Sequence, residues 1–203
     1  VLDFQGNTAY TKKGRKILIL APLRHLVTSP KAPYLFKRFL GKLSKDSKFP
    51  KLPPLNSSNL IYVDSKDKAD ACLEDLSKEP LIAFDIETSS KQRITHISFS
   101  SIHKTYSFTI TDLLDLEYIR KILMTDALKI AQNGKYDCLH LLHWNCPIRN
   151  YYFDTYGLMQ CWLAELPRSL DFIGSFFLDD ILYWKDEDES DKALYNAKDT
   201  WVT

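Results

Sequence analysis

The sequence has few cysteines and glycines, no long apolar run, and no methionine at its first position. Of its 203 residues, 4 are cysteine and 6 are glycine. No stretch approaches the roughly 20 apolar residues that a membrane-spanning helix requires. The first ten residues lack the basic-then-apolar pattern of a secretory signal peptide. These absences argue against a membrane protein or a secreted one. The missing methionine leads us to expect a fragment of a longer protein.

The cysteines form no CxxC pair. Cys138 and Cys146 share one stretch with His140 and His143, a combination that raises the possibility of zinc. Their spacing matches no standard zinc finger, and the stretch has the pattern of an amphipathic helix, so packing in the core is the favoured interpretation. Reduced thiols predict an intracellular location such as the cytoplasm, or wherever DNA is replicated, with an organelle or phage origin left open.

The composition is that of a globular protein with a full core. Hydrophobic residues make up 45% of the chain and charged residues 26%. The net charge of +1 conceals an asymmetry, because residues 1–60 hold about 12 lysines and arginines against about 2 acidic residues, and the remainder is net acidic. A basic segment beside an acidic body suits a metal-dependent enzyme with a polyanionic substrate. It equally suits a solvated, flexible linker.

Residues 1–58 differ in pattern from the rest. An apolar run at 16–21 predicts a strand, and 34–43 predicts a basic amphipathic helix. Residues 48–58 are rich in proline, lysine and serine, which is typical of a linker. We therefore predict a basic N-terminal extension at 1–58, of unknown function, followed by a domain at 59–203.

Residues 59–203 alternate between strand and helix patterns, which indicates an α/β fold. The apolar run at 80–86 predicts a central strand. Other strands are expected at 60–63, 94–99, 105–110 and 128–131, and helices at 65–76, 116–124, 134–144, 155–166, 169–177 and from about 191. The expected architecture is a mixed central sheet flanked by helices.

Three short motifs on this framework carry acidic side chains. In the first, Asp85 and Glu87 are separated by one residue at the end of the central strand, so both side chains point to the same side. Two adjacent carboxylates repel each other, and a divalent cation would relieve that repulsion. A strand end that simply enters solvent is the competing interpretation.

The second motif places Asn133 and Asp137 where a buried strand passes into a helix, at the carboxyl edge of the sheet where sites form in α/β proteins. A helix cap at Asn133, with Asp137 favoured by the helix N-terminus, would explain the same residues. The third motif puts Tyr195 and Asp199 four residues apart, on one face of the last helix. Taken alone, that spacing is also typical of an ordinary surface helix.

In this order, DxE, NxxxD and YxxxD resemble the DEDDy 3′→5′ exonucleases of the DnaQ-like, or ribonuclease H-like, superfamily. The similarity covers about residues 60–203 and looks closest to the proofreading domain of family A DNA polymerases of the bacterial and phage type. It is carried by FDIET at 84–88, QNGKYD at 132–137, FDT at 153–155 and YNAKDTWVT at 195–203. The resemblance implies an α/β, ribonuclease H-like fold with a basic N-terminal extension.

The resemblance also implies a two-metal-ion phosphodiester hydrolase that removes nucleoside monophosphates from DNA 3′ ends. The metal ligands would be Asp85, Glu87, Asp137 and Asp199, holding two Mg²⁺ or Mn²⁺ ions per site. Tyr195 would orient the attacking water, and Thr88, Asn133 and Lys135 would contact substrate. Asp154 is expected to cap a helix rather than to bind metal. The expected partners are a single-stranded DNA 3′ end and a polymerase domain in the same parent protein.

The chain departs from the family in two segments. Residues 88–93 are polar where related polymerases usually offer an apolar wedge to the terminal base. Residues 178–190 are strongly acidic and contain Tyr183 and Trp184, which could stack on a base or belong to a solvated loop. Two other functions fit the same motifs: an RNA 3′ exonuclease of the ribonuclease D type, and a non-catalytic nucleic-acid-binding scaffold.

Overall fold

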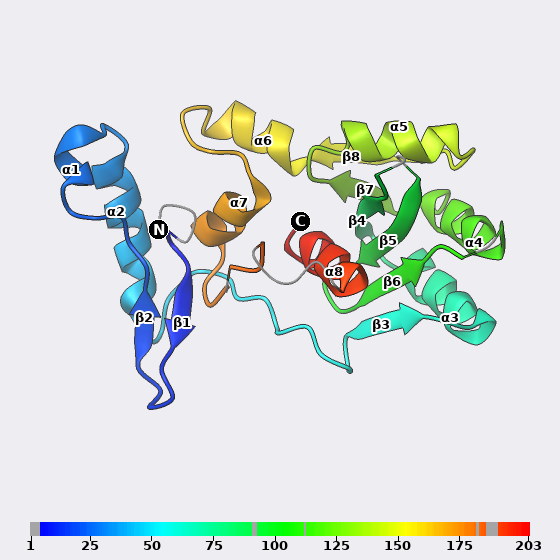
Figure 1. Ribbon diagram of the computed structural model, residues 1–203, viewed down its shortest axis with the longest axis horizontal. Coiled ribbons are helices and arrows are strands. Elements are labelled where there is room, and N and C mark those ends of the chain that lie inside the picture. The colour runs from blue at the N-terminus through cyan, green and yellow to red at the C-terminus, as the bar shows by residue number, and fades with distance from the viewer. Residues whose placement is uncertain (1–4, 91–92, 112, 182, 186–190) are drawn as a thin grey trace. The chain divides into compact units, whose positions relative to one another are not determined.

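A computed structural model describes residues 5–90, 93–111, 113–181, 183–185 and 191–203 (Figure 1). The described residues form two compact units. Unit 1 comprises those of 1–54 and 159–186, and unit 2 those of 55–158 and 187–203. The predicted boundary between an N-terminal extension at 1–58 and a domain at 59–203 stays a prediction. The packing adds that residues 159–186 fold together with the N-terminal segment. Among the described residues, no helix is long and apolar enough to cross a membrane.

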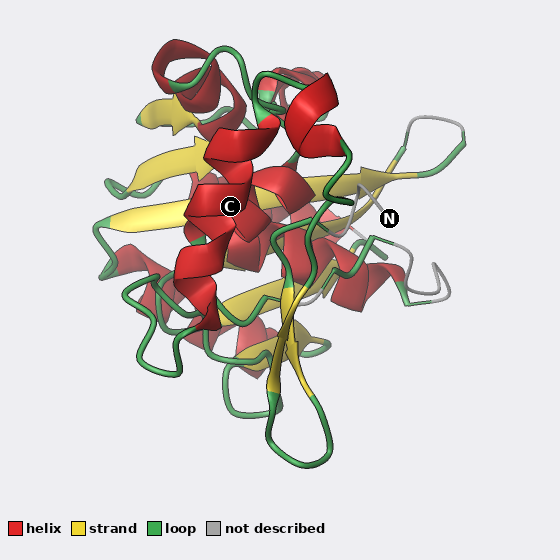
Figure 2. Cartoon of the chain, turned by 90° about the vertical axis from the view of Figure 1, so that its left-hand side faces the viewer, coloured by secondary structure: helices red, strands yellow, loops and turns green. Residues whose placement is uncertain are grey.

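Unit 2 is built on a six-stranded sheet with the strand order β3-β6-β5-β4-β7-β8. Its strands are β3 (Leu60–Val63), β4 (Leu81–Thr88), β5 (Ile94–Ser100), β6 (Thr105–Thr109), β7 (Leu128–Ala131) and β8 (Tyr151–Asp154). β5 runs antiparallel to β4 and β6, and the other neighbouring strands are parallel. The α/β fold with a mixed central sheet is therefore confirmed. Figure 2 shows helices flanking the sheet.

The helices of unit 2 cover the two faces of this sheet. They are α3 (Lys66–Ser77), α4 (Leu113–Leu123), α5 (Lys135–His143) and α8 (Lys192–Val202). Side chains of α3, α4 and α5 form one apolar core with Phe84, Phe99 and Phe108 of the strands. The alternate strand residues Ser98 and Ser107 hydrogen-bond to α8 instead. Because side chains alternate across a strand, α8 packs on the opposite face from α3, α4 and α5.

The remaining elements are β1 (Thr8–Tyr10), β2 (Lys16–Leu18), α1 (His25–Thr28), α2 (Ala32–Leu40), a 3₁₀ turn at Gly41–Leu43, α6 (Thr155–Trp162) and α7 (Leu170–Phe177). All but α6 belong to unit 1, and α6 begins in unit 2 and ends in unit 1. β1 and β2 pair as an antiparallel hairpin. In unit 1, Phe39 of α2 packs with Ile173 and Phe176 of α7. An apolar core thus joins two segments that are more than a hundred residues apart in sequence.

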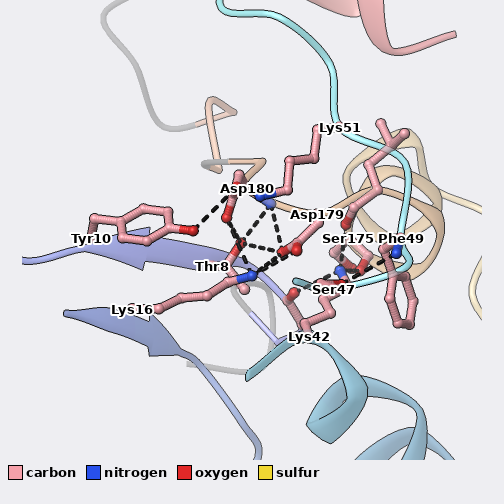
Figure 3. A network of polar contacts seen from close by, with 12 residues as sticks. Thr8, Tyr10, Lys16, Lys42, Ser47, Phe49, Lys51, Ser175, Asp179 and Asp180 are labelled. Atoms are coloured by element: carbon pink, nitrogen blue, oxygen red, sulfur yellow. Dashed lines mark hydrogen bonds and ion pairs between the residues drawn. The ribbon is translucent and has the colours of Figure 1, made fainter. Parts of the chain in front are cut away.

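Two acidic residues that follow α7, Asp179 and Asp180, form a polar network with residues of the N-terminal segment within unit 1 (Figure 3). Both carboxylate oxygens of Asp179 accept from Lys16 Nζ, at 2.7 and 2.6 Å, and the two side chains are 0% and 4% exposed. Asp179 also accepts from the hydroxyl of Thr8, and Asp180 pairs with Lys51. The network links the N-terminal hairpin to the end of α7.

Lys42 is the second buried cation of unit 1. Lys42 is fully buried, and its ammonium donates to the backbone carbonyls of Gly6, Ser175 and Leu178. Ser175 and Leu178 lie at the C-terminal end of α7, where carbonyls lack helical partners and favour a positive charge. Burial lowers the pKa of Lys42 to about 8, and nearby Asp179 opposes that shift.

The observed elements differ from the predicted ones at several places. The N-terminal helix runs over Ala32–Leu40 rather than 34–43, and the strand expected at 16–21 is the shorter β2. The helix expected at 155–166 ends at Trp162. The edge strand β8 was not predicted, because its aromatic residues directly precede a helix. The helix expected at 65–76 is α3, and Ser65 caps its start by accepting a hydrogen bond from the backbone N–H of Lys68.

Candidate active site

Strand β4 carries the first two acids on the face covered by α8. Phe84 and Ile86 are 0% and 6% exposed and belong to the apolar core on the opposite face. Alternation along the strand then directs Asp85 and Glu87 toward α8. A hydrogen bond of 2.7 Å from Asn196 Nδ2, on α8, to Asp85 Oδ2 confirms this direction.

Helix α8 brings a third acid to this pair. One carboxylate oxygen from each of Asp85, Glu87 and Asp199 lies within 4.8 Å of the other two. Asp199 is 8% exposed, and the two strand residues are half-buried. Carboxylates held this close repel one another, and the repulsion grows as water is excluded. The arrangement is therefore suited to a positively charged partner, and the oxygen donors match a hard divalent cation.

Asp137 lies beside this trio without joining it. Its Oδ1 accepts from the backbone N–H of Ile86, the residue between Asp85 and Glu87, at 3.0 Å. The side chain is 5% exposed. Burial raises the pKa of Asp137 from 3.8 to about 6, and the charge of Asp154 adds to the rise. Asp137 is thus next to the acidic cluster, but its described hydrogen bond faces the strand backbone.

The raised pKa predicts how Asp137 affects stability. Because the folded protein holds this proton more tightly than the unfolded chain, its ionisation lowers the free energy of unfolding as pH rises from about 4 to about 6. Asp137→Asn keeps an acceptor for Ile86 and cannot ionise. We expect the metal-free variant to be about 2 kcal/mol more stable than the wild type at pH 8.

At pH 4 the difference between the two proteins should nearly vanish. Urea unfolding with a chelator, at pH 4 and pH 8, measures it. A difference that does not depend on pH would contradict the assignment of the shift to burial of Asp137.

The predicted substrate residue Asn133 forms the turn between β7 and α5. Its φ of 54° is left-handed, a conformation that asparagine tolerates better than most residues. The carboxylate of Asp154 accepts from the backbone N–H of Asn133 at 2.8 Å and of Gly134 at 2.7 Å. It also accepts from the N–H groups of Tyr156 and Gly157 at the start of α6. The predicted capping role of Asp154 is confirmed, and the same carboxylate fixes the turn.

Gly134 is required at this turn by space. A Cβ added to it would lie 2.6 Å from the Cβ of Ala131 and 2.7 Å from the hydroxyl oxygen of Tyr151. The Cβ of Ala131 is fixed to the backbone of β7 and cannot move aside, whereas the hydroxyl of Tyr151 is the far end of a side chain. The close packing holds the entry to α5, and so the position of Asp137.

The other predicted site residues lie around the cluster. The hydroxyl of Thr88, at the end of β4, is 2.9 Å from that of Tyr136 on α5. Lys135 is exposed in the first turn of α5. Tyr195 is half-buried on α8, one helical turn before Asp199. Of the predicted polar segment 88–93, residues 91 and 92 lie outside the described residues. Of the acidic segment 178–190, residues 182 and 186–190 do so as well.

Sequence reasoning missed one residue that contacts the cluster and a second that contacts the first. Asn196 is fully buried and donates to Asp85, and Ser98 on β5 hydrogen-bonds to Asn196. The sequence carries no clear signal for Ser98, because β5 contains other polar residues, among them Thr95 and Ser100. Asn196 had only its place inside the YxxxD motif.

A separate cavity of about 370 Å³ lies at the ends of β3 and β6. Its lining includes Tyr62, Ser107 and Tyr118 and shares no residue with the acidic cluster. Its carboxylates are engaged locally, since Asp64 pairs with Lys68 and Asp115 accepts from Thr111. The convergent acids, rather than this cavity, are the candidate active site.

Solved structures provide the comparisons. The catalytic core of RRP6 from Trypanosoma brucei superposes with a TM-score of 0.58 and 17% identity, over 97% of this chain and 58% of that one. RNase D from Escherichia coli, an exoribonuclease involved in structured RNA processing, has a TM-score of 0.52 and 18% identity. The match covers 71% of this chain and 42% of that one. The Nibbler EXO domain from Aedes aegypti has a TM-score of 0.51 and 19% identity, over 75% of this chain and 78% of that one.

No protein-family model matches the sequence, and neither does any curated protein. The chain spans little more than half of the RRP6 core and less than half of RNase D. At sequence identities of 17–19%, the similarity to these structures shows a shared fold only. The closer resemblance to polymerase proofreading domains stays a prediction. The chain has the α/β ribonuclease H-like fold that these exonuclease structures share.

Proposed function

We propose that the chain is the core of a metal-dependent 3′→5′ exonuclease that removes nucleoside monophosphates from RNA 3′ ends, as in the ribonuclease D type. The observation that carries the proposal is the convergence of Asp85, Glu87 and Asp199 within 4.8 Å. The shared fold with RRP6 and RNase D supports it, and favours RNA over DNA as the substrate.

The donor set fits divalent metal ions. Every candidate ligand is a carboxylate, which suits Mg²⁺ or Mn²⁺ better than zinc. Asp85, Glu87 and Asp199 would hold the metal, and Asp137 would contribute from beside β4. The chemistry that two such ions supply is Lewis-acid activation of water and of the scissile phosphate.

The side chains around the cluster would bind and orient the substrate. Tyr195 lies on the same face of α8 as Asp199, so its phenol would orient the attacking water. Lys135 is an exposed cation at the start of α5 and would attract the phosphate backbone. Thr88 and Tyr136, joined at their hydroxyls, would contact the terminal nucleotide.

A second candidate function is proofreading of DNA 3′ ends beside a polymerase domain. The amino-acid sequences of the motifs support this function, because FDIET, QNGKYD and YNAKDTWVT resemble family A polymerases. Since the metal chemistry would be the same, only the sugar preference and the partner domain separate the two functions.

Degradation of matched oligonucleotides tests the substrate class. Single-stranded RNA and DNA of the same sequence, labelled at the 5′ end, are incubated separately with the protein and Mg²⁺. We expect the RNA to be shortened stepwise from its 3′ end at least about tenfold faster than the DNA, since a 2′-hydroxyl lets a protein distinguish the two. DNA shortened faster than RNA would replace the RNA proposal with the proofreading one. Binding without shortening of either strand would favour the scaffold function.

A further inference from the structure

A buried asparagine on α8 holds the carboxylate of Asp85. Asn196 has no exposed surface, and its Nδ2 lies 2.7 Å from Asp85 Oδ2. A carboxylate can only accept in this contact unless it is protonated, so the side chain of Asn196 must turn its NH₂ group toward Asp85. The hydrogen bond joins helix α8 to strand β4 inside the acidic cluster.

The other end of the amide is fixed as well. Asn196 Oδ1 lies 2.6 Å from the hydroxyl of Ser98, and that hydroxyl lies 2.5 Å from the hydroxyl of Thr200. With Thr200 donating to Ser98, the single hydroxyl proton of Ser98 is available for Oδ1. Both contacts therefore require the same orientation of the Asn196 amide, with Nδ2 toward Asp85 and Oδ1 toward Ser98.

The rigidity of this contact matters for Asp85. The terminal torsion of an aspartate side chain has a broad, roughly two-fold energy profile, so its carboxylate rotates unless something holds it. The NH₂ group of Asn196 holds one oxygen. It also offsets part of the repulsion among the three carboxylates, because a hydrogen bond to a charged acid favours its charged form.

We propose that Asn196 is a positioning residue that orients the Asp85 carboxylate for divalent-cation binding. This inference rests on the proposed function, since it assumes that the cluster binds metal. It assigns to Asn196 a task that the three acids cannot perform for themselves. Groups that hydrogen-bond to metal ligands typically contribute 10–100-fold to metal affinity or activity.

The competing explanation is that Asn196 serves only to pack α8 against the sheet. Thr200 supplies a matched control, because it lies on the same helix, is 1% exposed, and contacts the same Ser98. Its hydroxyl contacts Ser98 and the backbone carbonyl of Asn196 rather than Asp85. A loss of packing or of the Ser98 network should therefore appear in Thr200→Ala as well.

The test compares wild type, Asn196→Ala and Thr200→Ala. Thermal melts with a chelator first establish that each protein folds without metal. Isothermal calorimetry with Mn²⁺ alone then measures metal affinity in the absence of substrate. We expect Asn196→Ala to weaken Mn²⁺ binding about 10–100-fold, and Thr200→Ala to bind Mn²⁺ like the wild type even if its melting temperature falls.

A second variant covers the case in which Asn196→Ala does not fold. Asn196→Ser keeps a polar group for Ser98 but is too short to reach Asp85, and it should show the same loss of Mn²⁺ affinity. Wild-type affinity in a folded Asn196 variant, or an equal loss in Thr200→Ala, would overturn the inference. If the wild type itself binds no Mn²⁺, the proposed function fails instead, so the two failures are distinguishable.

Discussion

Asp85→Asn and Asp199→Asn are each expected to lower nuclease activity by at least about a thousandfold. Each change keeps the size of the side chain and replaces a charged oxygen ligand with a neutral amide, which binds Mg²⁺ far more weakly. The two residues come from β4 and α8, 114 positions apart in the chain, and they meet only in the acidic cluster. A similar loss at both positions would support their convergence on one chemical step.

Asp126→Asn is the control for this pair. Asp126 belongs to the same unit, its side chain is 84% exposed, and it pairs with Arg149 at the surface. Its replacement should leave activity at the wild-type level. Rates of release of labelled mononucleotides at saturating Mg²⁺ provide the measurement, with circular dichroism to verify folding. Wild-type activity in either cluster variant would remove that residue from the catalytic set.

Asp179→Asn is expected to destabilise unit 1 by about 3–5 kcal/mol, because it removes the counter-charge of a buried ammonium group. Lys16 and Asp179 are 4% and 0% exposed, and both oxygens of Asp179 accept from Lys16. With the carboxylate gone, the nearest remaining acid to Lys16 is Asp180, at the longer distance of 3.4 Å. Lys16 would then keep one longer ion pair in place of its two short hydrogen bonds to Asp179.

The neighbouring acid provides the control for this prediction. Asp180 is 23% exposed, pairs with the more exposed Lys51, and has a φ of 57° that asparagine tolerates. Asp180→Asn should therefore cost much less than Asp179→Asn. Urea midpoints of the two variants, followed by tryptophan fluorescence, compare them. Equal midpoints would show that the buried pair contributes no more than the exposed one.

Local pattern was sufficient to predict five of the six strands of unit 2 and the acidic residues at the end of β4. The alternation at Asp85 and Glu87 indicated a shared face, and the spacing of Tyr195 and Asp199 indicated one side of a helix. Both signals depend on near neighbours in the sequence. The meeting of the two segments followed only from the family resemblance.

The assembly of unit 1 could not be predicted, because the contacts that join its two segments are long-range. Lys16 and Asp179 are 163 residues apart, and Thr8 and Asp179 are 171 apart. A lysine and an aspartate at such separations look like ordinary surface charges in the sequence. The acidic segment was accordingly interpreted as a solvated loop or a stacking segment, whereas its first acid is buried against the N-terminal hairpin.

The partners of the motif residues were hidden for a similar reason. Asn196 follows Tyr195 directly and gives no periodic signal of its own, and its contact to Asp85 exists only once α8 crosses β4. The family resemblance implied that Asp137 is a metal ligand. Its placement against the backbone of Ile86 depends on how α5 packs beside β4.

Shortening of a 5′-labelled RNA tests most directly whether the acidic cluster supports exonucleolytic hydrolysis. The wild-type protein is incubated with the RNA in Mg²⁺, in Mg²⁺ with excess chelator, and with an RNA whose 3′ hydroxyl is blocked. We predict a ladder of products that shorten one nucleotide at a time from the free 3′ end, release of nucleoside 5′-monophosphates, and no cleavage in the chelator. Cleavage that persists without metal, or that begins inside the strand, would contradict this function.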